Sequence, residues 1–219
     1  MSDRSGNISA ARLSGHDLKM VSYDRSRSPL VRGILGLAKR VGIRYSCFRI
    51  FAISLKSTTA TDEAPLPSGY RFAELSPGDL SACPFPELRE CDWYGGPGSH
   101  AFGIFREDGV LVCAQWFWFG ERYQQQSFWP LESHEAASMH LVSAASERGK
   151  GIATQIKKHS ADQMRAKGFS RLYSRIWWTN TSSIRVSEKS GWSNVGTILE
   201  ISLPARSRPL RFVRRKRSL

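Results

Sequence analysis

The sequence predicts an α/β fold, and three stretches of the chain carry this prediction. Between residues 138 and 167, a half-buried strand pattern leads through a basic, glycine-containing turn into a helical pattern. Residues 171–192 repeat that order, with an alternating strand followed by a short helix. Upstream, residues 101–119 have the pattern of two strands joined by an Asp-Gly turn. Strands that alternate with helices indicate an α/β domain.

The N-terminal part of the chain is expected to contain a tail, a helix and a strand. Residues 1–28 are rich in Ser, Arg and Gly, which predicts a disordered basic tail. The segment 29–60 begins with apolar residues that share one helical face from Leu30 to Val41, with basic residues off that face. This pattern predicts a basic amphipathic helix. The run from Phe48 to Leu55 predicts a short strand, and a polar linker from Lys56 to Pro67 follows.

Residues 61–204 are expected to form one α/β domain. Gly69 to Leu75 alternates like a first strand, and Ser76 to Leu80 has the pattern of a cap and helix entry. A hairpin is predicted from Ala101–Arg106 and Val110–Phe119. The pattern does not place a second helix before this hairpin.

The turn Arg148-Gly149-Lys150-Gly151-Ile152-Ala153 joins a strand over Ser138–Ser143 to a helix over Ile152–Lys167. Ile152, Ile156 and Met164 share the apolar face of that helix, and Lys157 and the other basic residues are assigned to other faces. The two glycines let the backbone approach a ligand closely. The first N–H groups of the helix have no partner inside it, and the helix dipole favours an anion there. The turn therefore predicts a site for phosphate or pyrophosphate.

A second motif follows the strand Arg171–Trp177. It begins at Asn180, and either Thr181 or Ser182 can cap a short helix. Gly191 can take the left-handed conformation that ends this helix. Trp192 then begins a strand that runs to Leu203.

These two motifs resemble the signatures of the GNAT superfamily of N-acyltransferases. Arg148-x-x-Gly151-x-Ala153 resembles the loop that binds the pyrophosphate of acyl-CoA, and Asn180 to Trp192 resembles the second signature. The resemblance covers Ser138 to Leu203. It implies the GNAT fold, a mixed central sheet with a splayed CoA-binding strand pair. The N-terminal helix and strand are similar to those of GNAT-like proteins from bacterial polysaccharide gene clusters, which implies a bacterial protein.

The resemblance implies that acetyl-CoA is the co-substrate. A backbone N–H, that of Val142 or Ser143, is expected to polarise the thioester carbonyl for direct attack by an amine in a ternary complex. The four cysteines include no C-x-x-C pair and no His at ligand spacing, so we expect no metal and buried, reduced thiols. The residues expected to contact CoA are Leu141, Val142, Ser143, Arg148, Gly149, Lys150, Gly151, Ile152, Ala153, Asn180 and Ser183.

Three residues are candidates for acid–base chemistry. Many family members carry a tyrosine, as general acid toward the thiolate, at the position of Ser187. A serine hydroxyl is far less acidic and thiolate leaves well, so we expect Ser187 to be dispensable. His140 on the central strand and Glu135 at its start are the candidates for a general base, and core packing is the alternative for His140. The aromatic run Trp116–Phe119 predicts core packing, with a pocket for a stacked sugar ring as the alternative.

The net charge of +13 is unevenly distributed. Residues 1–60 carry 11 Lys/Arg and 3 acidic residues, a net +8, and residues 205–219 carry 7 Lys/Arg and no acid. The middle, 61–204, has a net charge of −2. The run from Arg206 to Arg217 predicts a flexible cationic tail. Both basic ends are expected to attract an anionic membrane surface, phosphate or an acidic polymer, and packing of the apolar face of the predicted N-terminal helix on the domain is the alternative.

The sequence thus predicts an acyl-CoA-dependent N-acyltransferase that acetylates a primary amine, with an amino sugar or cell-envelope precursor as the first candidate. Two alternatives stay open: a degenerate GNAT domain that acts as a binding scaffold, and an acetyltransferase of a ribosomal or nucleic-acid-associated target. A saccharide amine and a membrane surface are favoured as partners over nucleic acid. No signal peptide or spanning segment is evident, so we expect a cytoplasmic protein, with a peripheral position at the inner face of the membrane as a further expectation. The patterns do not predict an oligomeric state.

Overall fold

The computed structural model describes residue 40 and residues 42–56 and 65–216 of the 219-residue chain. The chain divides into two compact units, one with Ser46–Leu199 and Arg211–Leu219 and the other with Met1–Tyr45 and Glu200–Leu210. The basic tail predicted for residues 1–28 lies outside the described residues, as does the predicted amphipathic helix except for Arg40. No helix in the described part of the chain is long and apolar enough to cross a membrane.

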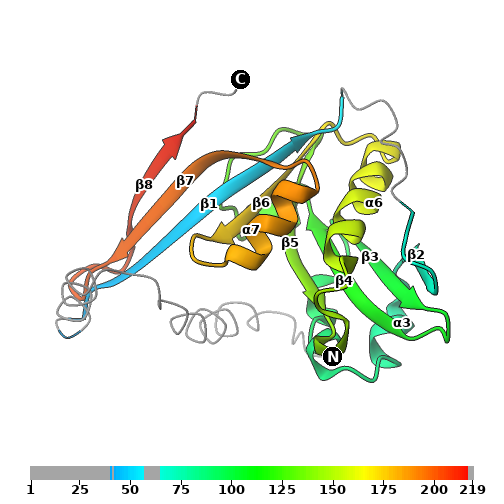
Figure 1. The fold of residues 1–219 in the computed structure, drawn as a ribbon. Helices are drawn as coiled ribbons and strands as arrows, with labels where there is room; N and C mark the ends of the chain where they lie inside the picture. Colours follow the sequence, from blue (N-terminus) through cyan, green and yellow to red (C-terminus); the bar gives the residue numbers. More distant parts are fainter. Residues whose placement is uncertain (1–39, 41, 57–64, 217–219) are drawn as a thin grey trace, which may run out of the picture. The chain divides into compact units, whose positions relative to one another are not determined.

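Within the described residues, one eight-stranded sheet has the order β2-β3-β4-β5-β6-β1-β7-β8 (Figure 1). Strands β2 to β5 pair antiparallel in sequence, β5 pairs parallel with β6, and β6 pairs antiparallel with β1. The predicted mixed sheet is therefore confirmed. The strands are β1 (Arg44–Ser54), β2 (Tyr70–Glu74), β3 (Ser99–Arg106), β4 (Leu111–Trp118), β5 (Glu135–Ser143), β6 (Arg171–Trp177), β7 (Ser193–Ser202) and β8 (Leu210–Arg215).

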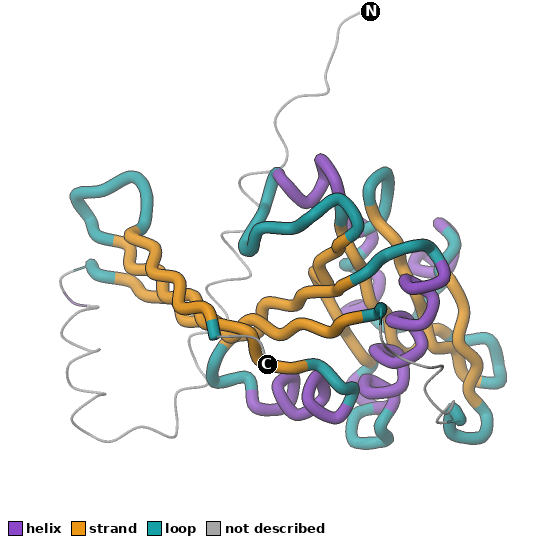
Figure 2. Tube along the Cα trace, turned by 90° about the horizontal axis from the view of Figure 1, so that it is seen from above, coloured by secondary structure: helices purple, strands orange, loops and turns teal. Residues whose placement is uncertain are grey.

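Helices lie on both faces of this sheet, with α6 and α7 on one face (Figures 1 and 2). The predicted helices after Ser76, Gly151 and Asn180 are confirmed as α3, α6 and α7. The sequence did not place α4 and α5, because helices of four and five residues are too short to show a helical period. The helices are α3 (Pro77–Ser81), α4 (Pro86–Arg89), α5 (Gly120–Gln124), α6 (Ile152–Ala166) and α7 (Thr181–Lys189), with 3₁₀ turns η2 (Asp92–Tyr94) and η3 (Ala145–Glu147).

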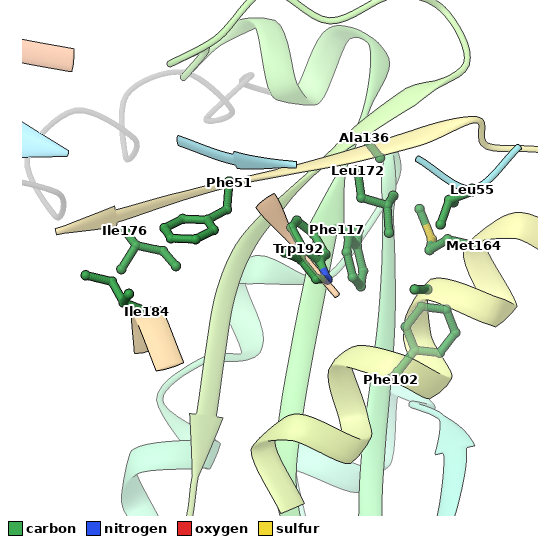
Figure 3. Packing of buried hydrophobic residues seen from close by; sticks show 11 residues of the cluster. Phe51, Leu55, Phe102, Phe117, Ala136, Met164, Leu172, Ile176, Ile184 and Trp192 are labelled. Atoms are coloured by element: carbon green, nitrogen blue, oxygen red, sulfur yellow. The ribbon is translucent and has the colours of Figure 1, made fainter. Parts of the chain in front are cut away.

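The core lies on both sides of β4, whose residues are all buried. Phe117 packs in the cluster beneath α6 and α7, which Figure 3 shows with Met164 and Trp192. Trp116 points the other way, into the cluster with α3 and α4. A strand covered by helices on both faces is apolar at successive positions, not only at alternate ones. The core-packing interpretation of the run from Trp116 is therefore confirmed for its first three residues, and Phe119 is half-buried.

Strand β1 lies in the middle of the sheet, between β6 and β7. It pairs antiparallel with β6, from Phe48 opposite Trp177 to Ser54 opposite Arg171. Ile50 and Phe51 are fully buried. The strand predicted from Phe48 is confirmed and begins four residues earlier, at Arg44. The sheet that holds the two sequence motifs thus includes a strand from the segment upstream of residue 61.

The C-terminal segment is not a flexible tail throughout. Leu210–Arg215 forms β8 at the edge of the sheet, beside β7, so the prediction for Arg206–Arg217 is wrong for this segment. The N–H of Lys216 donates a hydrogen bond to the carbonyl oxygen of Val195 at 2.9 Å. An edge strand tolerates charged side chains because they stay in solvent. Net charge therefore does not prevent this segment from pairing.

All four cysteines are free thiols. Cys83, Cys91 and Cys113 are buried, as predicted, and Cys47 is half-buried. Burial raises the pKa of the Cys113 thiol to about 12, so this thiol stays protonated at neutral pH.

Candidate functional site

Strands β5 and β6 separate part-way along their length. They pair only from Glu135 opposite Arg171 to Ser138 opposite Ser174, although β5 continues to Ser143 and β6 to Trp177. Figure 1 shows the two strands diverging beyond this point. We call the region between 139–143 of β5 and 175–177 of β6 the splay. The splayed strand pair expected from the sequence is confirmed.

The splay exposes one edge of β5. Residues 140–143 still pair with β4, with Trp116 opposite His140 and Cys113 opposite Ser143. On the other side, no strand of the described residues pairs with them. Alternate peptide groups of a strand point to opposite sides, so N–H and C=O groups of β5 face the splay. A ligand with amide groups could pair with them there.

A bulge at Met139 sets the direction of the side chains at the splay. Phe117 is opposite Ser138, and the next pair is Trp116 opposite His140, so Met139 is the extra residue of β5. Ser138, on the α6 and α7 face, accepts a hydrogen bond from Gln115 Nε2 at 3.0 Å. The bulge moves His140 to the opposite face.

On that face His140 is half-buried against aromatic rings. Its ring stacks on Tyr94, with ring centres 4.7 Å apart and planes at 1°, and lies 6.1 Å from the ring of Trp116. Tyr94 in turn contacts Trp93, whose ring centre is 3.9 Å away. Tyr94 and Trp93 come from η2 and are half-buried. The structure thus places one predicted acid–base residue beside a partly exposed aromatic group.

Glu135 lies at the opposite end of β5 from the splay. Its carboxylate is buried and accepts a hydrogen bond from the N–H of Glu132 at 2.9 Å. Tyr173 donates to it at 3.4 Å, and Arg171 lies 3.8 Å away. Three residues of extended strand, roughly 10 Å, separate Glu135 from Ser138. The structure does not bring Glu135 together with His140.

The loop after β5 forms an open anion site. Gly149 and Gly151 have φ angles of 84° and 81°, in the left-handed region that favours glycine. A Cβ at either position would meet no atom within 4 Å, so the loop is open to a ligand. Among the described residues, no acceptor pairs with the backbone N–H groups from Gly149 to Ala153. The 15-residue helix α6 begins here, and its dipole adds positive potential.

Buried Glu147 holds this loop in place. It accepts hydrogen bonds from Lys150 Nζ at 2.8 Å and from the Tyr70 hydroxyl at 2.6 Å. Arg106 lies 3.8 Å away. The hydrogen bond from Lys150 is the largest cause that holds the pKa of the Glu147 carboxyl below its usual value. The Lys150 side chain is therefore engaged within the protein, although both Lys150 and Arg148 are exposed.

The second motif begins across the splay, after β6. Asn180 caps α7, because its Oδ1 accepts a hydrogen bond from the N–H of Ser183 at 3.1 Å. The capping role predicted for Thr181 or Ser182 is therefore wrong, and Ser182 instead donates its hydroxyl to Asn180 at 2.9 Å. The cap lies one residue earlier than expected, at Asn180. An amide oxygen, like a hydroxyl, can accept a hydrogen bond from an N–H group of the first turn. Gly191 takes the predicted left-handed conformation, with φ 79°.

Sequence reasoning assigned Lys157 to a polar face, and the structure corrects this. Lys157 is buried with 3% of its surface exposed, and its Nζ donates to Ser187 Oγ at 2.9 Å. The same nitrogen lies 3.7 Å from the centre of the Trp192 ring. Lys157 shares a helical row with Ala161 and Met164, four and seven residues on, which are both buried. This row of buried residues was the sequence signal that could have predicted the burial of Lys157.

A separate cavity of about 1020 Å³ lies among the residues between α5 and β5 and those of β8. None of the predicted site residues lines it. Aromatic Trp129 and basic Arg211 and Arg215 are part of its lining. It shares no residue with the anion loop or the splay.

The profile of the Acetyltransferase (GNAT) family matches residues 69–192, which is more than half of the chain. This range includes β5, the anion loop, α6, β6 and α7. The chain belongs to the GNAT acetyltransferase family. No match to this GNAT protein was found among curated proteins.

Solved structures share the fold of this GNAT protein. The tandem GNAT protein of the clavulanic acid biosynthesis pathway has a TM-score of 0.56 at 12% identity, covering 83% of this chain and 60% of that one. The glucosamine N-acetyltransferase region of a fungal multi-domain β-N-acetylglucosaminidase has a TM-score of 0.56 at 14% identity, covering 85% and 23%. An N-acetyltransferase from Sphaerobacter thermophilus has a TM-score of 0.52 at 15% identity, covering 78% and 56%. The chain thus spans less than two thirds of the length of each, and at these identities the likeness shows the fold alone.

Proposed function

We propose that this GNAT protein is an N-acyltransferase that transfers an acyl group, in the first place acetyl, from acyl-CoA to a primary amine. The observation that carries the proposal is the position of two features in one β-α-β unit. Strand β5 has an unpaired edge at the splay, and it leads directly into a loop with unpaired N–H groups at the start of α6. A ligand with an amide-containing arm and a pyrophosphate, which is the chemistry of CoA, matches both features.

In this proposal each predicted CoA residue has a defined part. The pyrophosphate binds the N–H groups from Gly149 to Ala153, with Arg148 adding charge. Lys150 contributes its N–H, because its side chain is bonded to Glu147. The pantetheine arm pairs with the free backbone edge from Leu141 to Ser143. Asn180 and Ser183 border the arm from the β6 side.

The proposed reaction depends mainly on how the thioester and the amine are positioned. The N–H of Val142 or Ser143 donates to the thioester oxygen and stabilises the negative charge that develops there. A neutral amine attacks the carbonyl carbon directly, and the close approach of the two reactants supplies much of the rate. His140 is the side chain beside the splay that can accept the proton of the amine.

For the acceptor we propose an amino sugar or a cell-envelope precursor that carries one. The half-buried rings of Trp93 and Tyr94 adjoin His140, and aromatic rings provide a stacking surface for a sugar. The similar fungal region is described as a glucosamine N-acetyltransferase. In this chain, the support for an amino-sugar acceptor is the aromatic group of Trp93 and Tyr94, and not the description of the fungal region.

Calorimetry with acetyl-CoA tests the CoA site. Gly151→Asp places a negative charge at the pyrophosphate, and we expect it to weaken binding at least tenfold, about 1.4 kcal/mol or more. Asp is tolerated both at a helix N-cap and in the left-handed conformation, so the variant is expected to fold. Gly168→Asp is the matched control, because Gly168 also has a positive φ and an open Cβ position but lies at the other end of α6. Equal affinities of the two variants would overturn the assignment.

A panel of amines tests the acceptor. Acetyl-CoA is incubated with glucosamine, other amino sugars, polyamines and peptides, and the acetylated product is identified by mass. Turnover of an amino sugar supports the proposal. Binding of acetyl-CoA without turnover of any amine favours the scaffold function, for which Ser187 in place of a tyrosine is the motive. Turnover only on a ribosomal protein or peptide favours the third candidate.

A further inference from the structure

Lys157 and Ser187 form a buried polar pair in the contact between α6 and α7. Their side chains are joined by the 2.9 Å hydrogen bond from Nζ to Oγ, and Trp192 covers the nitrogen. The residues around this contact on α6 and α7 include Ala161, Met164 and Ile184, which are apolar. An ammonium group among apolar side chains is costly without a counter-charge. Packing alone therefore does not account for a lysine at this position.

No carboxylate of the described residues pairs with Lys157. Burial lowers the pKa of its amine to about 7, while the Trp192 ring and the Ser187 hydroxyl favour the protonated form. The amine can therefore hold or release a proton near neutral pH. Among the other titratable groups on the surrounding elements, Cys113, His140, His159, Asp162, Arg165 and Arg175 contact other partners, and Arg185, Glu188 and Lys189 are exposed.

The topology places this pair alongside the splay, about 8 Å along α6 from the wide end. Helix α6 starts after the end of β5, and α7 starts after the end of β6, so the first turns of both helices lie at the wide end. Both helices run back along the strands (Figure 1). Lys157 is in the second turn of α6, and Ser187 is in the second turn of α7. The extended segment from Ser143 back to Ser138 spans roughly 16 Å.

The direction in which CoA would lie along the splay determines that its sulfur end comes near Lys157. A pyrophosphate at Gly149 to Ala153 lies at the wide end, so the arm that leaves it runs toward Ser138. The sulfur atom is the far end of that arm. Because the proposed pyrophosphate site is the start of α6, the arm begins on the α6 and α7 face, whereas His140 and Tyr94 lie on the opposite face. Lys157 is thus on the side of the leaving group and not on the side of the amine.

We propose that Lys157, held in place by Ser187, donates the proton that the departing CoA thiolate takes up. This inference rests on the proposed function. As the amine nitrogen forms the C–N bond, the C–S bond breaks and its electron pair goes to sulfur. The Lys157 ammonium gives sulfur a proton and becomes a neutral amine. The product nitrogen loses one proton to water, and Lys157 takes one proton from water before the next turnover.

The step can be tested without the acceptor, because the CoA thiol and neutral Lys157 are the products of the proton transfer and face each other in the CoA complex. The probes are CoA and desulfo-CoA, which lacks the sulfur. At pH 8 we expect the full-length protein to bind CoA about threefold or more tightly than desulfo-CoA, because neutral Lys157 accepts a hydrogen bond from the bound thiol. Lys157→Met is expected to abolish this preference and to leave desulfo-CoA affinity unchanged. Lys158→Met, on the same helix, is the matched control and is expected to behave as wild type.

An unchanged CoA preference in Lys157→Met would overturn the proposal. If that variant does not fold, the wild type decides, because equal affinities for CoA and desulfo-CoA at pH 8 also overturn it. Failure of the wild type to bind either CoA or desulfo-CoA overturns the proposed function instead. The two failures are therefore distinguishable.

Discussion

Lys157 shows how one buried side chain couples the stability of this protein to pH. Its pKa is about 7 in the folded protein and near 10.5 in an exposed lysine. Below pH 7 both states bind the proton, and the folded state carries the full cost of a buried charge. Between the two values the unfolded chain binds a proton that the folded protein does not. The free energy of unfolding therefore rises with pH across this window.

We expect Lys157→Met to remove this dependence. Below pH 7 the variant should be more stable than wild type, because a methionine of similar length carries no charge to bury. The difference should shrink as pH rises toward 10.5, on the order of 1 kcal/mol for each pH unit. Urea unfolding of both proteins at several pH values measures it. A stability difference that stays constant between pH 7 and 10 would show that Lys157 keeps its proton in the folded state.

Single residues also mark where sequence reasoning stopped. The glycines at 149 and 151 were placed correctly, because a left-handed turn and an open approach leave a direct trace in residue type. The bulge at Met139 left no such trace, yet it decides on which face His140 lies. Lys157 was misplaced because charge was weighed above its position in the row with Ala161 and Met164. The hydrogen-bond partner of Lys157 is Ser187, 30 residues away, and no local sequence pattern predicts a contact over that separation.

At the scale of elements, the sequence predicted the strands except β8, and the helices α3, α6 and α7. The strands and the two longer helices have visible periods, and α3 was predicted from its cap and its proline. It did not predict how β1 joins the sheet. Seven residues of β1, from Phe48 to Ser54, pair with β6, and this pairing joins segments more than 100 residues apart. Pairing between strands that are distant in sequence depends on which strand edges the other elements leave free, and a local pattern does not show this. The strand itself was recognised, and its neighbours were not.

The position of β1 predicts which fragments fold. A chain that begins at residue 61 lacks a central strand and leaves the facing edges of β6 and β7 without partners. We expect it to be insoluble or to lack cooperative thermal unfolding by circular dichroism. A chain that begins at residue 42 keeps β1 and is expected to unfold cooperatively, near the full-length protein.

A point substitution checks the same role of β1 within the full-length chain. Phe51→Ala empties a fully buried site and should cost about 3–5 kcal/mol. Cooperative unfolding of the fragment from residue 61 would contradict the assignment of β1 to the core, as would a Phe51 variant that is as stable as wild type.

For the whole molecule, the charge distribution separates the ends of the chain from its centre. The segment from 61 to 204 has a net charge of −2, whereas the two ends together carry +15. Part of the C-terminal charge belongs to β8, where Phe212 and Val213 are exposed beside several arginines. Exposed apolar side chains among cations suit an anionic lipid surface. The proposed CoA site lies in the part of the chain that is nearly neutral. The proposed attraction to a surface and the proposed acyl transfer would therefore be carried by different segments.

The last prediction concerns attraction to that surface. We expect full-length protein to sediment with vesicles that contain anionic lipid at low salt and to be released at high salt, because salt screens the charges. Deleting residues 1–41 removes 8 Lys/Arg and 3 acidic residues and leaves the sheet intact, so release should occur at lower salt. Replacing Phe212 with Glu in the full-length chain should lower binding further if β8 contacts the lipid. Neutral vesicles are the control. Equal binding to neutral and anionic vesicles would contradict the charge argument, and retention of RNA without any vesicle binding would place nucleic acid ahead of membrane as the partner.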